Sequence, residues 1–181
     1  MEESPASLKI SKTDAAKRQL ETAIRMWFFD GDPVSIHALG AAAHQLVHDL
    51  GKARGITAVL RSLPDIRQEY KKEMLRAVAQ DENFFKHADR DPDGLLDFKP
   101  ITTTFFLMDA VLTYEALTGE RPPILRAFQM WMMLQNPGLV KEESRADWTA
   151  QMKGLGSTLA RMSKQEFFTL YLGAIAKSQS A

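Results

Sequence analysis

The hydrophobic residues of this chain recur at helical spacing, in stretches bounded by residues that start or stop helices, and this pattern most constrains the fold. No stretch shows the sustained alternation of β-branched and polar residues that is typical of strands. The composition agrees, because 45% hydrophobic and 25% charged residues in a chain of 181 are typical of an ordinary globular protein. The pattern predicts a single all-α domain over residues 1–181, an antiparallel helical bundle of about six or seven helices.

The first two stretches predict a helical hairpin. The residues that bound the two helices are Ser11 or Thr13 and then residues 30–32 for the first, and Asp32 with Pro33 and then Gly55 for the second. Between these bounds lie a hydrophobic stripe from Ala16 to Phe28 and a second helix that reaches about Ala53. The link between them is too short for anything but an antiparallel pair.

The remaining helices follow from the same signals. We expect a short helix over residues 56–62, a long one from Asp65 to Ala88, a fourth from a cap at Thr102 or Thr103 to Leu117 with Gly119 after it, a fifth from Pro122 to Gln135, a short one from Ser144 around Trp148, and a last one over Phe167–Ala176 after a capping box at Ser163. The fifth helix is hydrophobic on almost all sides, which predicts that it is the central helix, with some of its surface buried in a dimer. Residues 1–10 and 177–181 are predicted to be flexible termini.

Composition also narrows the function. The 23 basic residues balance the 23 acidic ones, so no overall field attracts nucleic acid or anionic lipid. The absence of cysteine excludes disulfides, thiolate nucleophiles and cysteine-bound zinc, and it fits a cytoplasmic protein. Because the sequence has neither a secretory signal nor a hydrophobic run long enough for a membrane helix, we expect a soluble protein with no membrane partner.

Three histidines share one face of the predicted second helix. His37, His44 and His48 lie seven and four residues apart, so their side chains point in similar directions. Imidazoles one turn apart can bind a divalent transition metal if carboxylates such as Asp89 or Asp109 complete the ligand set. The alternative interpretation is structural, with half-buried imidazoles at a helix interface that hydrogen-bond to the backbone or to carboxylates.

His48 and Asp49 lie within LVHDLGK, residues 46–52, which resembles the His-Asp dyad of the HD phosphohydrolases. In that family the dyad binds a divalent metal that activates water, and another metal-binding histidine comes from an earlier helix. Here His37 and His44 belong to the same predicted helix as the dyad. Asp49 also points roughly 100° away from the histidine stripe on that helix.

The segment ENFFKH, residues 82–87, resembles the Arg-Asn-x-x-x-His motif of HEPN-domain proteins, which are helical bundles. The opening hairpin with its alanine-rich second helix is similar to that family too, so the resemblance covers roughly the first 90 residues. In the family, Arg and His meet across a dimer to cleave RNA. The resemblance therefore implies a homodimer, with Asn83 and His87 at the family's catalytic positions in a polar groove.

Glu82 stands where the HEPN motif has its arginine. A glutamate repels the phosphate that the arginine would hold, which argues against RNA cleavage. The resemblance then implies a binding or regulatory role with an RNA or protein partner. A structural alternative for Asn83 and His87 is a pair that closes the end of a helix, where a histidine suits the helix dipole.

The stretch after His87 has the spacing of a calcium-binding loop. Its oxygen-bearing positions and glycine are Asp89, Asp91, Asp93, Gly94 and Asp97. The twelfth position, which should supply a bidentate glutamate, is Pro100, and proline has no side-chain oxygen. The stretch is therefore predicted to be a turn with solvated aspartates, and calcium binding is not expected.

Three functions are consistent with the sequence. The first is a HEPN-like binding or regulatory module that uses Asn83 and His87. The second is a metal-dependent enzyme that uses His37, His44 and His48 with a carboxylate. The third is an interaction scaffold whose histidines are structural.

Overall fold

The computed structural model describes residues 7–56, 80–81, 83–89, 91–136 and 156–179, and these ranges contain α-helices and no strand. The helices are α1 (Lys12–Phe28), α2 (Pro33–Ala53), α5 (Ile101–Thr118), α6 (Pro123–Gln135), α8 (Gly156–Leu159) and α9 (Lys164–Gln179). Residues 80–81 and 83–86 are also helical. The all-α prediction is confirmed. The helices predicted over residues 56–62 and around Trp148, and most of the long one from Asp65, lie outside the described residues.

The predicted hairpin is formed by α1 and α2, and its caps are those that the sequence indicates. Ser11 caps α1 in a reciprocal capping box with Asp14. The Asp32 side chain accepts a hydrogen bond from the backbone N–H of Ser35 at the start of α2. In the turn between them Asp30 adopts a positive φ of 52°, and its carboxylate pairs with Lys164 of α9.

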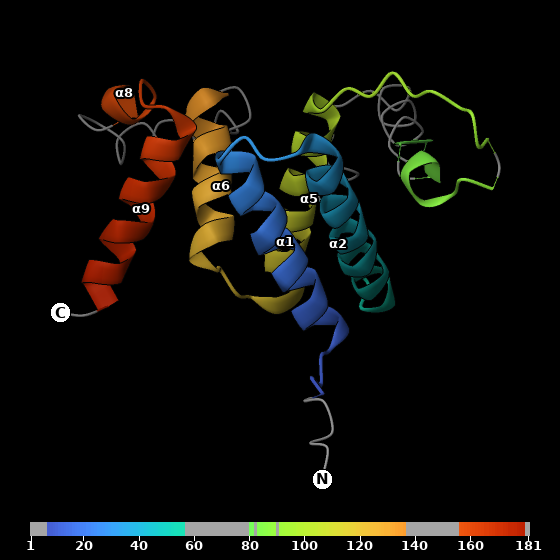
Figure 1. Cartoon of the computed structure of the whole chain (residues 1–181). Helices are drawn as coiled ribbons and strands as arrows, with labels where there is room; N and C mark the ends of the chain where they lie inside the picture. Colours follow the sequence, from blue (N-terminus) through green and yellow to red (C-terminus); the bar gives the residue numbers. More distant parts are fainter. Residues whose placement is uncertain (1–6, 57–79, 82, 90, 137–155, 180–181) are drawn as a thin grey trace, which may run out of the picture.

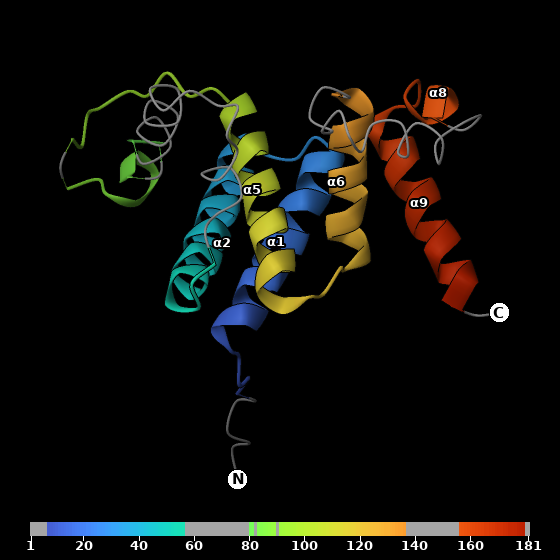
Figure 2. The same cartoon turned by 180° about the vertical axis from the view of Figure 1, so that it is seen from behind.

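The helices α2 and α5 lie side by side and run in the same direction (Figures 1 and 2). A small residue allows their close approach, since a Cβ added at Gly40 would lie 3.0 Å from Cδ2 of Leu107. The chain returns between them through residues 54–100, whereas α1 with α2 and α5 with α6 are antiparallel (Figure 1). The predicted bundle is therefore present, and α2 and α5 are a parallel pair of neighbours within it.

A single buried cluster joins α1, α2, α5, α6 and α9. At its centre Phe28 of α1 contacts Phe128 of α6 edge-on, and stacks on Phe167 and Phe168 of α9. All four rings are at most 2% exposed. These contacts join α9 to α1 and α6, and α9 lies on the side of α6 away from α2 (Figure 1).

Three details differ from the sequence prediction. The helix α5 begins at Ile101 after Pro100, and neither Thr102 nor Thr103 caps it. Burial extends around most of α5, whereas Met130 and Met133 of α6 are only partly buried, so α5 is at least as central as α6. The helix α9 begins at Lys164 and reaches Gln179, so residues 177–179 continue the helix. The Ser163 capping box with Glu166 is present as predicted.

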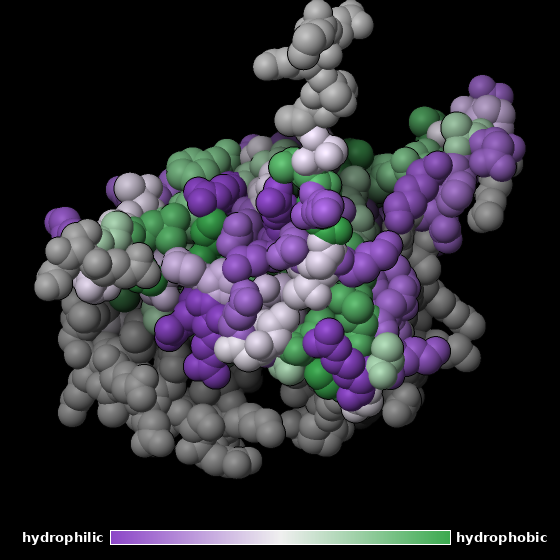
Figure 3. Space-filling view, turned by 90° about the horizontal axis from the view of Figure 1, so that it is seen from below, coloured by the Kyte–Doolittle hydropathy of each residue, from purple (hydrophilic) through white to green (hydrophobic). Residues whose placement is uncertain are grey.

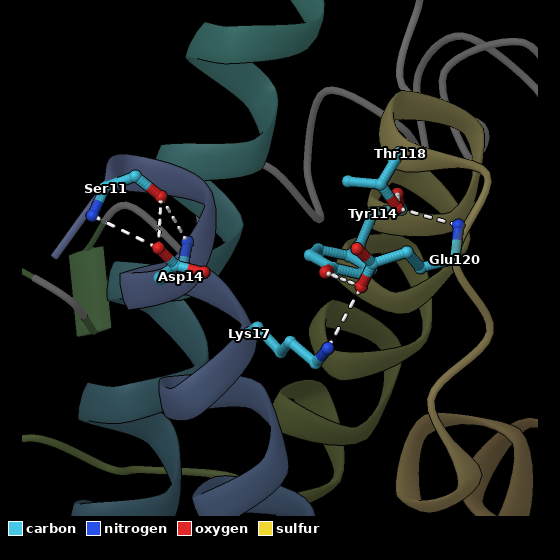
Figure 4. Close-up of polar contacts among 6 residues, drawn as sticks. All are labelled: Ser11, Asp14, Lys17, Tyr114, Thr118 and Glu120. Carbon is cyan, nitrogen blue, oxygen red and sulfur yellow. Dashed lines mark hydrogen bonds and ion pairs between the residues drawn. The ribbon is translucent and has the colours of Figure 1, made fainter.

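A polar network at the lower end of the molecule ties α1 to the end of α5 (Figure 4). The carboxylate of Glu120 accepts hydrogen bonds from the Lys17 ammonium at 3.0 Å and from the Tyr114 hydroxyl at 2.8 Å. Burial and the neighbouring Glu120 raise the pKa of Tyr114 to about 12. On this end, hydrophobic side chains form separate patches between polar ones (Figure 3). None of the helices in the described ranges is both long and hydrophobic enough to cross a bilayer.

Candidate functional site

The histidine stripe of α2 faces α5, and the parallel packing brings successive imidazoles opposite successive polar side chains. His37 is 1% exposed, and its Nδ1 lies 2.9 Å from the Thr103 hydroxyl oxygen. Two turns further along α2, Nε2 of His44 lies 2.8 Å from the carboxylate of Asp109, and this carboxylate is buried. His44 fits the structural alternative, a partly buried imidazole that contacts a carboxylate across the helix interface. His37 departs from it, because it is fully buried and its partner is a hydroxyl.

The predicted metal ligands do not assemble into one site. Among the residues that the structure describes, no three histidine, aspartate or glutamate side chains form a group that could hold a metal ion. Asp89 lies instead beside His87, with 4.0 Å between its Oδ1 and the imidazole Nδ1. Asp49 is mostly exposed and accepts a hydrogen bond from Gln45, while 3.8 Å separates it from Nδ1 of His48. The geometry thus gives no support to either metal hypothesis.

His37 contacts the segment 80–99, of which the structure describes all residues but 82 and 90; this is the green segment of Figures 1 and 2. The rings of Phe85 and Phe98 meet the imidazole edge-on, with centroids at 5.5 and 5.3 Å. Phe106 of α5 completes the enclosure at 5.8 Å. A buried imidazole surrounded by three aromatic rings therefore joins this segment to the α2–α5 interface.

Asn83 and His87 line one pocket of about 440 Å³. The backbone N–H of His87 donates to the carbonyl of Asn83 at 3.0 Å, so the two residues close the end of the helical turn one above the other. The other residues that line the pocket are Gln80, Phe84, Asp91, Leu95 and Leu96. None of His37, His44 and His48 lines this pocket.

The acidic stretch forms a turn beside this pocket. The backbone N–H of Gly94 donates to the carbonyl of Asp91 at 2.9 Å, which closes a four-residue turn, Asp-Pro-Asp-Gly. Aspartate at the first position, proline at the second and glycine at the fourth are the residues that such a turn favours. The turn that the sequence predicts is therefore confirmed.

Asp81 is a candidate that sequence reasoning missed. The residue is 8% exposed and lines a second pocket of about 230 Å³, which shares Gln80 and Leu96 with the first. Burial raises the pKa of Asp81, and the nearby His37 only partly opposes this. The signal was present, because Asp81 stands three residues after Val78 and four before Phe85, on the hydrophobic stripe of its helix. A carboxylate on such a stripe is a buried one.

No family model, curated protein or solved structure matches this chain. The functional interpretation therefore rests on the geometry of the two pockets and on the charges around them.

Proposed function

We propose that this protein is a HEPN-like helical-bundle binding module, regulatory in role, that holds a segment of a partner protein in the pocket of Asn83 and His87. The observation that carries the proposal is that both residues line the same pocket, with their polar groups beside hydrophobic ones. The role of the bundle is then to hold residues 80–99 in place through His37.

The composition of the pocket suits a peptide segment. Gln80, Asn83 and His87 supply donors and acceptors, while Phe84 and Leu96 supply hydrophobic surface. Leu95 at the rim is 100% exposed, as a leucine that covers a partner would be before binding. Hydrophobic contact combined with a few polar groups is typical of sites that bind peptides.

The charges favour a protein over RNA. Residues 80–99 contain six acidic side chains against three basic ones, and Asp91 lies in the pocket wall. Binding of RNA draws its affinity mainly from lysine and arginine contacts to phosphates, which this segment lacks in excess. An acidic surface instead attracts a basic partner and increases its rate of association.

The proposal is tested by selecting peptides from a random library on the full-length protein and measuring their affinity by fluorescence anisotropy. The double variant Asn83→Ala, His87→Ala should bind the selected peptides at least tenfold more weakly, which corresponds to about 1.4 kcal/mol. His48→Ala, which removes an imidazole outside the pocket, should bind them as the wild type does. If no peptide is enriched, or if the double variant binds equally well, the proposal fails.

RNA is the competing partner in the same experiment. A labelled single-stranded RNA should show no saturable anisotropy change at moderate salt. Tight RNA binding that weakens with salt and depends on His87 would replace the protein partner with RNA.

The HEPN resemblance also leads us to propose a homodimer. Sedimentation equilibrium of the full-length protein should then give twice the mass of the chain, and a monomer at all micromolar concentrations would contradict it.

A further inference from the structure

We propose that the pocket beside Asp81 binds a basic side chain, lysine or arginine, and that this side chain anchors the partner segment. The inference rests on the proposed function in one respect, since it names the chemistry of the group by which that partner is recognised. The cation site itself can be tested without any partner.

The first support is the burial of Asp81 and the absence of a hydrogen-bond partner for it among the described residues. The residue is only 8% exposed, and its side chain makes no hydrogen bond or ion pair with any residue in the described ranges. A buried carboxylate without such a bond is costly, and in native proteins this cost is usually offset by a hydrogen bond or a charge partner. Asp81 lines the pocket, so a cation bound there can contact its carboxylate.

The second support is the size and lining of the pocket. Its volume of about 230 Å³ lies below the range of roughly 300–1,000 Å³ typical of sites for drug-sized molecules, so a single side chain fits better than a nucleotide. Its other lining residues are Gln80, Leu96, Asp97, Lys99 and Thr102. Two carboxylates against one exposed ammonium give the pocket a negative balance. The stem of a lysine or arginine can lie along Leu96 while its charged end reaches Asp81.

The third support is the position of the pocket. Gln80 and Leu96 line both this pocket and the one that contains Asn83 and His87, so the two are neighbours. One extended segment can therefore place a basic side chain at Asp81 and its next residues at His87.

The test is a nuclear magnetic resonance titration of the full-length protein with n-butylammonium chloride as a lysine probe, and with n-butanol as an uncharged match. We expect saturable shifts of the backbone amides of residues 80–81 and 96–102 with the cation and none with the alcohol. Asp81→Asn should weaken cation binding at least tenfold, or about 1.4 kcal/mol. The control Asp93→Asn removes an equal charge from the same acidic segment outside both pockets and should change the affinity less than twofold.

Two outcomes of this titration overturn the inference. One is the absence of saturable shifts at these amides in the wild-type protein, and the other is equal loss of affinity in Asp81→Asn and Asp93→Asn, which would indicate a diffuse effect of charge. The selected peptides separate this inference from the proposed function. Peptides that depend on His87 but bind Asp81→Asn normally and contain no basic residue would refute the cation pocket alone. Butylammonium binding at Asp81 without any selected peptide would refute the peptide-binding function alone.

Discussion

Replacement of Asp81 by asparagine should make the protein more stable at neutral pH. Asp81 is only 8% exposed, and its pKa is raised because the effect of burial exceeds the favourable influence of His37. Leaving a buried polar group unsatisfied costs about 1–3 kcal/mol, and more when the group is charged. Asparagine has nearly the same shape and removes the charge. Asparagine keeps a polar group at this position, so only the cost of the charge is removed. We therefore expect Asp81→Asn to increase the free energy of unfolding by about 1 kcal/mol at pH 7.

The sign of the pH dependence follows from the direction of the pKa shift. Below the ordinary aspartate pKa of 3.8, Asp81 is protonated in both the folded and the unfolded chain, and its charge costs nothing. As the pH rises above that value, the unfolded chain loses the proton first, so the folded state becomes less stable until its own higher pKa is passed. The advantage of the asparagine variant should therefore be largest at neutral pH and should disappear in acid.

The assay is urea denaturation of wild type, Asp81→Asn and Asp93→Asn at a series of pH values. Thermal scans should agree, because 1 kcal/mol changes the Tm of a domain of this size by about 2–4 °C. Asp93→Asn should stay within about 0.5 kcal/mol of wild type at every pH, since its side chain is exposed. An Asp81→Asn protein that is less stable than wild type at pH 7, or whose gain is the same in acid, would refute the reasoning.

Four further substitutions test the packing and the polar contacts between helices. Gly40→Ala should destabilise the protein by about 1–3 kcal/mol, because the new Cβ would approach a leucine methyl to 3.0 Å, whereas Gly173→Ala, with nothing within 4 Å, should stabilise it by up to about 1 kcal/mol in urea denaturation. Tyr114→Phe should lower the Tm and raise the pKa of Glu120 in a titration followed by nuclear magnetic resonance, because that pKa is lowered by Lys17 and by the tyrosine hydroxyl. Asp109→Ala should cost about 1–3 kcal/mol in urea, since it removes a buried carboxylate and leaves the partly buried His44 imidazole without its 2.8 Å partner.

The hairpin could be predicted closely because its signals are local. Ser11, Asp32 and Pro33 act through hydrogen bonds and backbone geometry within four residues, so the sequence nearby contains the information. The residue at which α5 begins was harder to predict from the sequence. Thr103 has the side chain of a cap, but its hydroxyl contacts His37, 66 residues earlier in the chain. A contact over that distance depends on the tertiary fold and has no local signature.

In the candidate site, too, local features could be predicted from the sequence, whereas contacts between distant segments could not. The one-turn spacing of Asn83 and His87 was sufficient to predict that they face the same way, and both line one pocket. Whether His44 meets Asp109 depends on the relative direction of α2 and α5, which the residues between them do not reveal. Asp81 was overlooked because a polar run suggests an exposed position, although its place on the hydrophobic stripe indicates burial.

The turn between α1 and α2 also limits what related sequences can contain. The positive φ of 52° at Asp30 is tolerated mainly by glycine, asparagine and aspartate. At Gly31 a Cβ would meet the Cβ of Met26 at 3.1 Å and its carbonyl oxygen at 3.2 Å, so only glycine fits well. Asp32 must be a capping residue and Pro33 suits the first turn of α2. Together these give a four-residue search pattern, Asp/Asn/Gly, then Gly, then Asp/Ser/Thr/Asn, then Pro, by which divergent relatives can be sought between two helices even where overall identity has been lost.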